Sequence, residues 1–118
     1  MSIAELISQL QTQPNSIEFN DVMAVIEANY DYTATEFSNG AGNELVINAA
    51  GTNEGSCRLF AFAQLNQLDQ AQTLALFGRF YREDVLQHPE GTDHANIRNF
   101  IKYGWDGITF QAIALVAK

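Results

Sequence analysis

The sequence lacks the features that mark disulfide-stabilised, membrane-spanning and signal-peptide-bearing proteins. Cys57 is its only cysteine, so no intramolecular disulfide can form. The reducing cytoplasm is therefore the expected compartment. No apolar run approaches the roughly 18 residues that a membrane-spanning helix needs. The N-terminus has no basic stretch and no cleavage site, so we expect no signal peptide.

Basic residues are absent from the whole first half of the chain. Residues 1–57 contain eight acidic side chains and no Lys or Arg, whereas residues 58–118 contain six of each, so the first half carries the net charge of −8. An acidic surface repels phosphate groups, so we expect neither a nucleic acid nor a membrane as partner. The length of 118 residues and the absence of a linker or repeat predict a single domain over 1–118.

Helical signals recur along the chain. Ser2 with Glu5 forms a capping-box pattern that opens a helix ending near residue 12, and Ser16 or Asn20 is expected to cap a second helix. Residues 54–68 are apolar on most sides, which is typical of a central, buried helix. Asp69 with Gln72 forms a second capping-box pattern, which opens a further helix that we expect to continue until the His-Pro pair at 88–89. Phe77 and Phe80 are expected to face the core from this helix.

The remaining segments predict a fifth helix and a small β element. Thr92 or Asp93 is expected to cap the fifth helix, and Gly104 to end it. The segments near 32–38 and 108–113 favour extended structure and are expected to pair as antiparallel strands. The predicted fold is mainly α, of the α+β class, with about five helices packed around the central helix 54–68.

Three segments carry a family resemblance. They are NYDYTATEFSNG at 29–40, GTNEGSCRLFAFAQL at 51–65 and YREDVLQHPEGTDHANIRNFIKYGWDGITF at 81–110. Together they resemble the HopJ (HopPmaJ) type III effector family. The resemblance implies a small, mainly helical bacterial protein, and it carries over no catalytic residue. The family is named for members delivered into plant cells, so type III secretion stands as an alternative to residence in the cytoplasm.

The start of the central helix is the first candidate for chemistry. Cys57 lies in its first turn, where the helix dipole favours a thiolate. His94 could act as its base, with Asp93 or Asn96 to orient the imidazole, and His88 is the alternative base. Asn53 could donate to an oxyanion. This set would make a cysteine-dependent hydrolase or transferase. The competing interpretation is that Cys57 is a small, inert core residue.

The segment 88–94 is the second candidate. His88 and His94, with nearby carboxylates, have the chemistry of divalent-metal ligands, but their six-residue separation across a loop does not match known zinc sites. Helix termination by Pro89 and capping explain the same residues. We therefore expect no metal and no cofactor.

A ring of polar loop residues is the third candidate, because Asn, Gly and Thr in several loops can form a ligand-binding cleft. Trp105 could serve either as a core residue or as a binding anchor. The candidate binding residues are Asn39, Thr52, Asn53, Glu54, His88, Asp93, His94, Asn96 and Trp105.

Three functions follow from these patterns. The leading hypothesis is a non-enzymatic interaction protein that contacts another macromolecule, a host protein if the chain is exported. The alternatives are the enzyme that uses Cys57 and His94, and a housekeeping protein that binds a small ligand through the polar loops.

Overall fold

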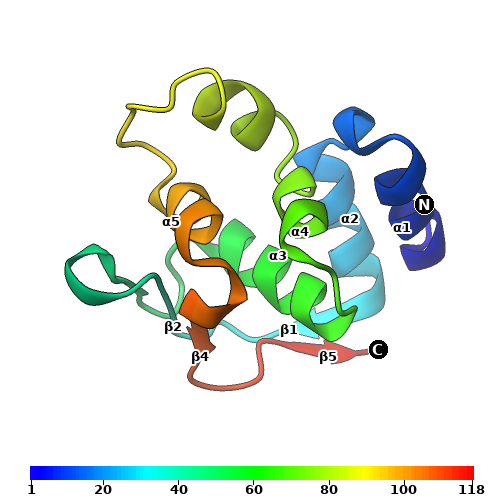
Figure 1. Ribbon diagram of the computed structural model, residues 1–118. Coiled ribbons are helices and arrows are strands. Elements are labelled where there is room, and N and C mark those ends of the chain that lie inside the picture. Colours follow the sequence, from blue (N-terminus) through cyan, green and yellow to red (C-terminus); the bar gives the residue numbers. More distant parts are fainter.

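The computed structural model describes residues 1–118, and α3 (Glu54–Leu65) lies at the centre of the fold (Figure 1). Leu59, Phe60 and Phe62 of this helix are fully buried. The ring of Phe60 lies 5.0–6.3 Å, between centroids, from four other aromatic rings, those of Phe37, Phe77, Phe100 and Trp105. The predicted central helix is therefore confirmed, although it ends at Leu65 and not at residue 68.

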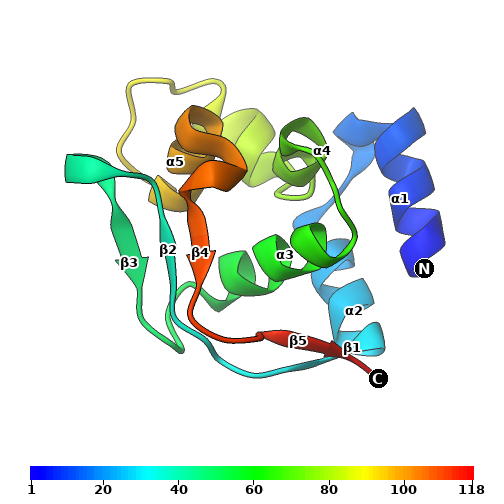
Figure 2. The same cartoon turned by 60° about the horizontal axis from the view of Figure 1, so that its bottom comes forward.

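Four further α-helices surround α3: α1 (Ile3–Thr12), α2 (Phe19–Asn29), α4 (Gln70–Ala75) and α5 (Ala95–Tyr103) (Figures 1 and 2). The capping box predicted at the start of α1 is present, since the Ser2 hydroxyl accepts the N–H of Glu5 at 3.0 Å. The caps predicted for α2 were wrong. The N-cap residue is Glu18, whose side chain makes no capping hydrogen bond. The Ser16 hydroxyl donates to the carbonyl of Gln13 instead, and Asn20 lies inside the helix.

Five short strands form two antiparallel sheets. In the first, β2 (Phe37–Asn39) lies between β3 (Val46–Asn48) and β4 (Ile108–Phe110). In the second, β1 (Tyr30–Tyr32) pairs with β5 (Leu115–Ala117). The three-stranded sheet stands beside one end of α3, opposite α1 and α2 (Figure 2). The predicted pairing of the two extended segments is confirmed by β2 and β4, whereas the sequence did not predict the β1–β5 pair.

The helix that the sequence predicts from residue 69 to residue 87 is broken. α4 ends at Ala75, and a separate π-helical segment, η3, runs over Phe80–Val85. Gly78 lies between them with φ of +61°. Phe80, expected to face the core, is 40% exposed as a result.

The start of α5 also differs from the prediction. Its N-cap is His94, with φ of +51°, and neither Thr92 nor Asp93 occupies that position. The helix ends at Gly104, which has positive φ as a helix-terminating glycine does. The indole N–H of Trp105, just beyond, donates to the carbonyl of Leu68 at 3.0 Å, so this side chain serves the core. None of the helices has the length and apolar character needed to cross a membrane.

Gly78→Ala should destabilise the fold by about 2–3 kcal/mol, because a left-handed conformation costs a non-glycine residue roughly 1–2 kcal/mol and overpacking adds to it. A Cβ at this position would lie 3.0 Å from both the Ile17 carbonyl oxygen and the Phe19 nitrogen. Denaturant unfolding measures the change.

Gly42→Ala is the matched control, since Gly42 has φ of +56° but no atom within 4 Å of an added Cβ. The Gly42→Ala variant should lose about 1 kcal/mol of unfolding free energy, the conformational cost alone. Equal losses in the two variants would contradict the role of the close backbone contact.

Candidate functional site

A cavity of about 350 Å³ opens where the first turns of α3 and α5 face each other. We call it the α3–α5 cleft. Polar side chains on its wall come from the start of each helix, and three phenylalanines provide an aromatic wall. The cleft is lined by Phe19, Val46, Asn53, Gly55, Ser56, Phe77, Phe80, His94, Ala95, Asn96 and Ile97.

Both helices begin at this cleft with the same backbone geometry. The N-cap residues Asn53 and His94 have φ of +49° and +51°, and neither side chain caps its own helix. The first N–H groups of each helix, at residues 54–56 and 95–96, consequently have no acceptor within the protein. Two helix N-termini, each carrying a partial positive charge, therefore border one cavity.

A network of buried asparagines holds the two walls in place. Asn39, Asn48 and Asn96 are 0%, 2% and 7% exposed. Asn96 donates through Nδ2 to Oδ1 of Asn48 at 2.9 Å and accepts at Oδ1 from Nδ2 of Asn48 and of Asn39, each at 3.1 Å. Asn53 donates to the same Asn48 oxygen at 2.7 Å. Because Asn48 contacts both Asn53 and Asn96, β3 fixes the distance between the starts of α3 and α5.

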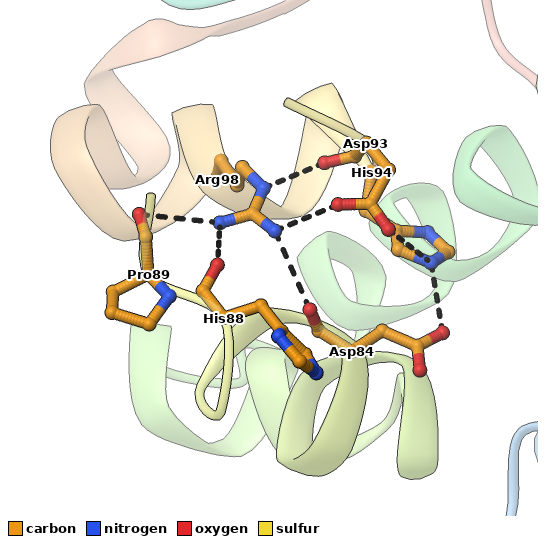
Figure 3. A network of polar contacts seen from close by, with 6 residues as sticks. All are labelled: Asp84, His88, Pro89, Asp93, His94 and Arg98. Atoms are coloured by element: carbon orange, nitrogen blue, oxygen red, sulfur yellow. Dashed lines mark hydrogen bonds and ion pairs between the residues drawn. The ribbon is translucent and has the colours of Figure 1, made fainter. Parts of the chain in front are cut away.

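The imidazole of His94 is held at the rim of the cleft. Its Nε2 lies 3.0 Å from Oδ2 of Asp84, and its ring lies 5.3 Å from the ring of Phe80 (Figure 3). Asp84 belongs to η3, so the π-helical segment positions the histidine of the next helix. This pair could not be predicted from the sequence, because the two residues belong to different elements.

Arg98 holds the loop before α5 in place through hydrogen bonds (Figure 3). Its guanidinium donates to the carbonyl of His88 at 2.8 Å, to the carbonyl of Asp93 at 2.6 Å and to the Asp93 carboxylate at 2.7 Å. The same guanidinium holds the pKa of the Asp93 carboxyl below its usual range. These bonds engage the Asp93 side chain and the His88 carbonyl in the loop, outside the lining of the cleft.

Cys57 lies apart from His94. The thiol is 1% exposed, donates to the carbonyl oxygen of Thr35 at 3.6 Å and is not part of the cleft lining. Burial raises its pKa, which reduces the thiolate fraction near neutral pH. No hydrogen bond joins the thiol to either histidine, so the structure does not bring the proposed nucleophile and base together.

The other residues named from the sequence separate into two groups. Asn53, His94 and Asn96 all line the cleft. Asn39 does not line it but donates a hydrogen bond to the carbonyl of Asn96. The remaining candidates are engaged elsewhere: the Glu54 carboxylate accepts from the hydroxyl of Tyr32, and Thr52 donates to the carbonyl of Ala49. No group of three or more His, Cys, Asp or Glu side chains is placed to hold a metal ion.

Part of the lining was not predicted from the sequence. Phe77 and Phe80 were expected in the core as part of one long helix, and Phe19 was not among the candidate site residues. Ser56 was expected at the start of the buried helix but was not named as a site residue. A polar residue directly before the buried cysteine is the one signal that could have identified it.

Fold and site together define a small α+β protein built on one buried helix, with a polar and aromatic cleft beside that helix. The chain belongs to the HopJ type III effector protein family, whose model matches residues 3–115. It is similar to a solved structure described as a crystal structure of the unknown-function protein VPA0580, with 53% identity and a TM-score of 0.94. That match covers 100% of this chain and 95% of the other. No curated protein matches.

Asn96→Ala should cost about 2–4 kcal/mol of unfolding free energy, because it strips hydrogen-bond partners from two buried amides at roughly 1–3 kcal/mol each. Chemical denaturation of the variant tests this expectation. Asn20→Ala, at an exposed α2 position without a side-chain hydrogen bond, is the control, and its change should stay within about 0.5 kcal/mol. A loss for Asn96→Ala as small as that of the control would show that the network contributes little.

Alkylation of Cys57 should be roughly tenfold or more slower in the folded protein than in denaturant, because a buried thiol with a raised pKa is inert. The rate should be the same in the His94→Ala variant. Timed labelling followed by mass spectrometry measures both rates. Rapid, pH-dependent labelling that His94→Ala slows would restore the cysteine-dependent enzyme.

Proposed function

We propose that this HopJ-family protein is a non-enzymatic binding protein and that the α3–α5 cleft receives a small organic ligand. The observation that carries the proposal is the meeting of Asn53, His94 and Asn96 on the wall of one cavity of about 350 Å³. This volume lies within the range of about 300–1,000 Å³ that small-molecule pockets occupy.

The lining indicates the character of the ligand. Phe19, Phe77 and Phe80 offer an apolar surface, and Phe80 is exposed enough to contact a bound molecule. The unpaired N–H groups at the starts of α3 and α5 are hydrogen-bond donors that border the same cavity. A compound with a planar apolar part and an acceptor group satisfies both walls. The asparagine network holds these donors in place before binding, which reduces the entropic cost of association.

A contact with another macromolecule is the second candidate, and one feature favours it. β3 is an edge strand. The residues on either side of the cleft-lining Val46 are exposed: Leu45 is 44% exposed and Ile47 is 64% exposed. A protein segment bound along this edge would cover both side chains and close one side of the cleft.

The family name supports export by a type III apparatus as part of this function. In that case the protein leaves the cell that makes it and acts on a partner in the host. Leu6 and Leu10 of α1 are buried in the core. Export of the chain in extended form therefore requires α1 to detach from the core first.

The enzyme alternative is the least supported of the three. The thiol of Cys57 is buried against Thr35 and its pKa is raised. His94 is hydrogen-bonded to Asp84.

A thermal-shift screen of nucleosides, aromatic acids and heterocyclic metabolites should identify compounds that stabilise the protein, since a ligand at 100 times its Kd adds about 2.7 kcal/mol. The Ser56→Tyr variant, which fills the cleft with a phenol ring, should lose this response. Ser8→Tyr, at an exposed α1 position, is the matched control and should retain it. Hits that stabilise wild type and Ser56→Tyr equally would place their binding outside the cleft. A screen without hits would argue for the macromolecular contact.

A further inference from the structure

Arg58 of α3 differs from most other basic residues of the chain. Four of the six Lys and Arg side chains pair with carboxylates, and Arg58 does not: it has neither an ion pair nor a hydrogen bond to any protein acceptor. The four paired residues are Arg79, Arg82, Arg98 and Lys102.

The guanidinium of Arg58 is nevertheless held in position. Its central carbon lies 4.2 Å from the centroid of the Tyr32 ring. The hydroxyl of Tyr32 donates to Oε1 of Glu54 at 3.2 Å, which fixes that ring. Stacking orients a planar guanidinium while leaving its N–H donors free, and such an arginine matches the two oxygens of a carboxylate.

Arg58 borders a second cavity, of about 310 Å³, which lies between α2, β1 and α3. Ser56 and Arg58 are two residues apart on α3, so their side chains point roughly 200° apart around the helix. The Arg58 cavity and the α3–α5 cleft are accordingly lined by different residues, with none in common.

Charges of both signs line the Arg58 cavity without pairing with each other. Glu27 and Asp31 are on its wall together with Arg58 and Lys118, and none of these four takes part in an ion pair. Unpaired opposite charges around one cavity are complementary to a molecule that carries a positive and a negative group of its own.

The rest of the wall is apolar or aromatic. Met23 and Ile26 contribute from α2, and the hydroxyl of Tyr30 accepts from Nδ2 of Asn66 at 3.2 Å, which orients its ring. An apolar side chain of a ligand can pack against this surface while its charged groups contact the polar side.

We propose that the Arg58 cavity binds a free α-amino acid with an apolar side chain. Arg58 binds the carboxylate through two N–H donors, Glu27 and Asp31 bind the ammonium, and Met23 and the ring of Tyr30 contact the side chain. A phosphate dianion is disfavoured, because the protein carries a net charge of −8 and two carboxylates line the cavity. A zwitterion adds no net charge. This site is independent of the function proposed for the α3–α5 cleft.

Calorimetric titration of the full chain with L-leucine tests the proposal. N-acetyl-L-leucine lacks the ammonium and L-leucinamide lacks the carboxylate, so each should bind about tenfold or more weakly, the equivalent of about 1.4 kcal/mol. L-methionine, L-valine and L-phenylalanine extend the series, and inorganic phosphate should not compete.

Matched variants assign the binding to this cavity. Arg58→Gln and the double variant Glu27→Gln with Asp31→Asn should each raise the Kd for L-leucine tenfold or more. Arg79→Gln, at an arginine far along the chain in an exposed ion pair, should leave it unchanged. Ser56→Tyr should also leave it unchanged, which separates this test from that of the α3–α5 cleft. Circular dichroism checks that each variant is folded.

Three results would overturn the proposal. The first is the absence of saturable binding of all four amino acids at concentrations up to about 1 mM. The second is binding of N-acetyl-L-leucine or phosphate as tight as that of L-leucine, which would indicate a simple anion site. The third is undiminished L-leucine binding by folded Arg58→Gln.

Discussion

The enclosure of α3 is the constraint on which the rest of the structure depends. A helix that is apolar on nearly all sides cannot lie against a single layer, so it requires neighbours in every direction. The helices α1, α2, α4 and α5 and both small sheets provide them, with the aromatic rings around Phe60 filling the space between. The N-terminal end of α3 reaches polar surroundings, and both cavities open near that end.

The polar surroundings at that end follow from the same constraint. The three-stranded sheet contacts α5 beside the buried helix α3. This contact is made by buried amide side chains. Buried amides are stable only when their donors and acceptors are paired, so the network of Asn39, Asn48 and Asn96 admits few arrangements. The Oδ1 atom of Asn39 is the exception, a buried acceptor without a partner. The rigidity of the α3–α5 cleft is thus a consequence of pairing amides in the interior.

The sequence predicted features that depend on neighbouring residues. The capping boxes at Ser2 and Asp69, the apolar character of α3 and the terminating Gly104 are all local patterns, and the structure contains each of them. The break at Gly78 was missed because it depends on contact with the backbone of Ile17 and Phe19, some sixty residues earlier in the chain. The strand β1 begins at Tyr30, directly after the last residue of α2, so no turn signal separates it from that helix in the sequence.

The candidate site was predicted to a similar degree. Asparagine and histidine in glycine-rich loops indicated a polar cleft, and Asn53, His94 and Asn96 do meet in one. Their partners could not be identified, since a phenylalanine on a cavity wall and one in the core have the same local pattern. The interpretation of Cys57 as a nucleophile relied on its place in the first turn of a helix. That position says nothing about which way the thiol points, and here it points to Thr35.

The attachment of residues 86–94 to the body of the protein by Arg98 has a dynamic consequence. Nearly all residues of this segment are exposed, so it contributes little apolar area to the core, and one guanidinium supplies several of its anchoring bonds. Segments held in this way open at a lower free energy than the global unfolding free energy. Because the segment ends at His94, each opening would displace the imidazole at the rim of the α3–α5 cleft. The rate at which molecules enter and leave that cleft would then follow the fluctuations of this loop.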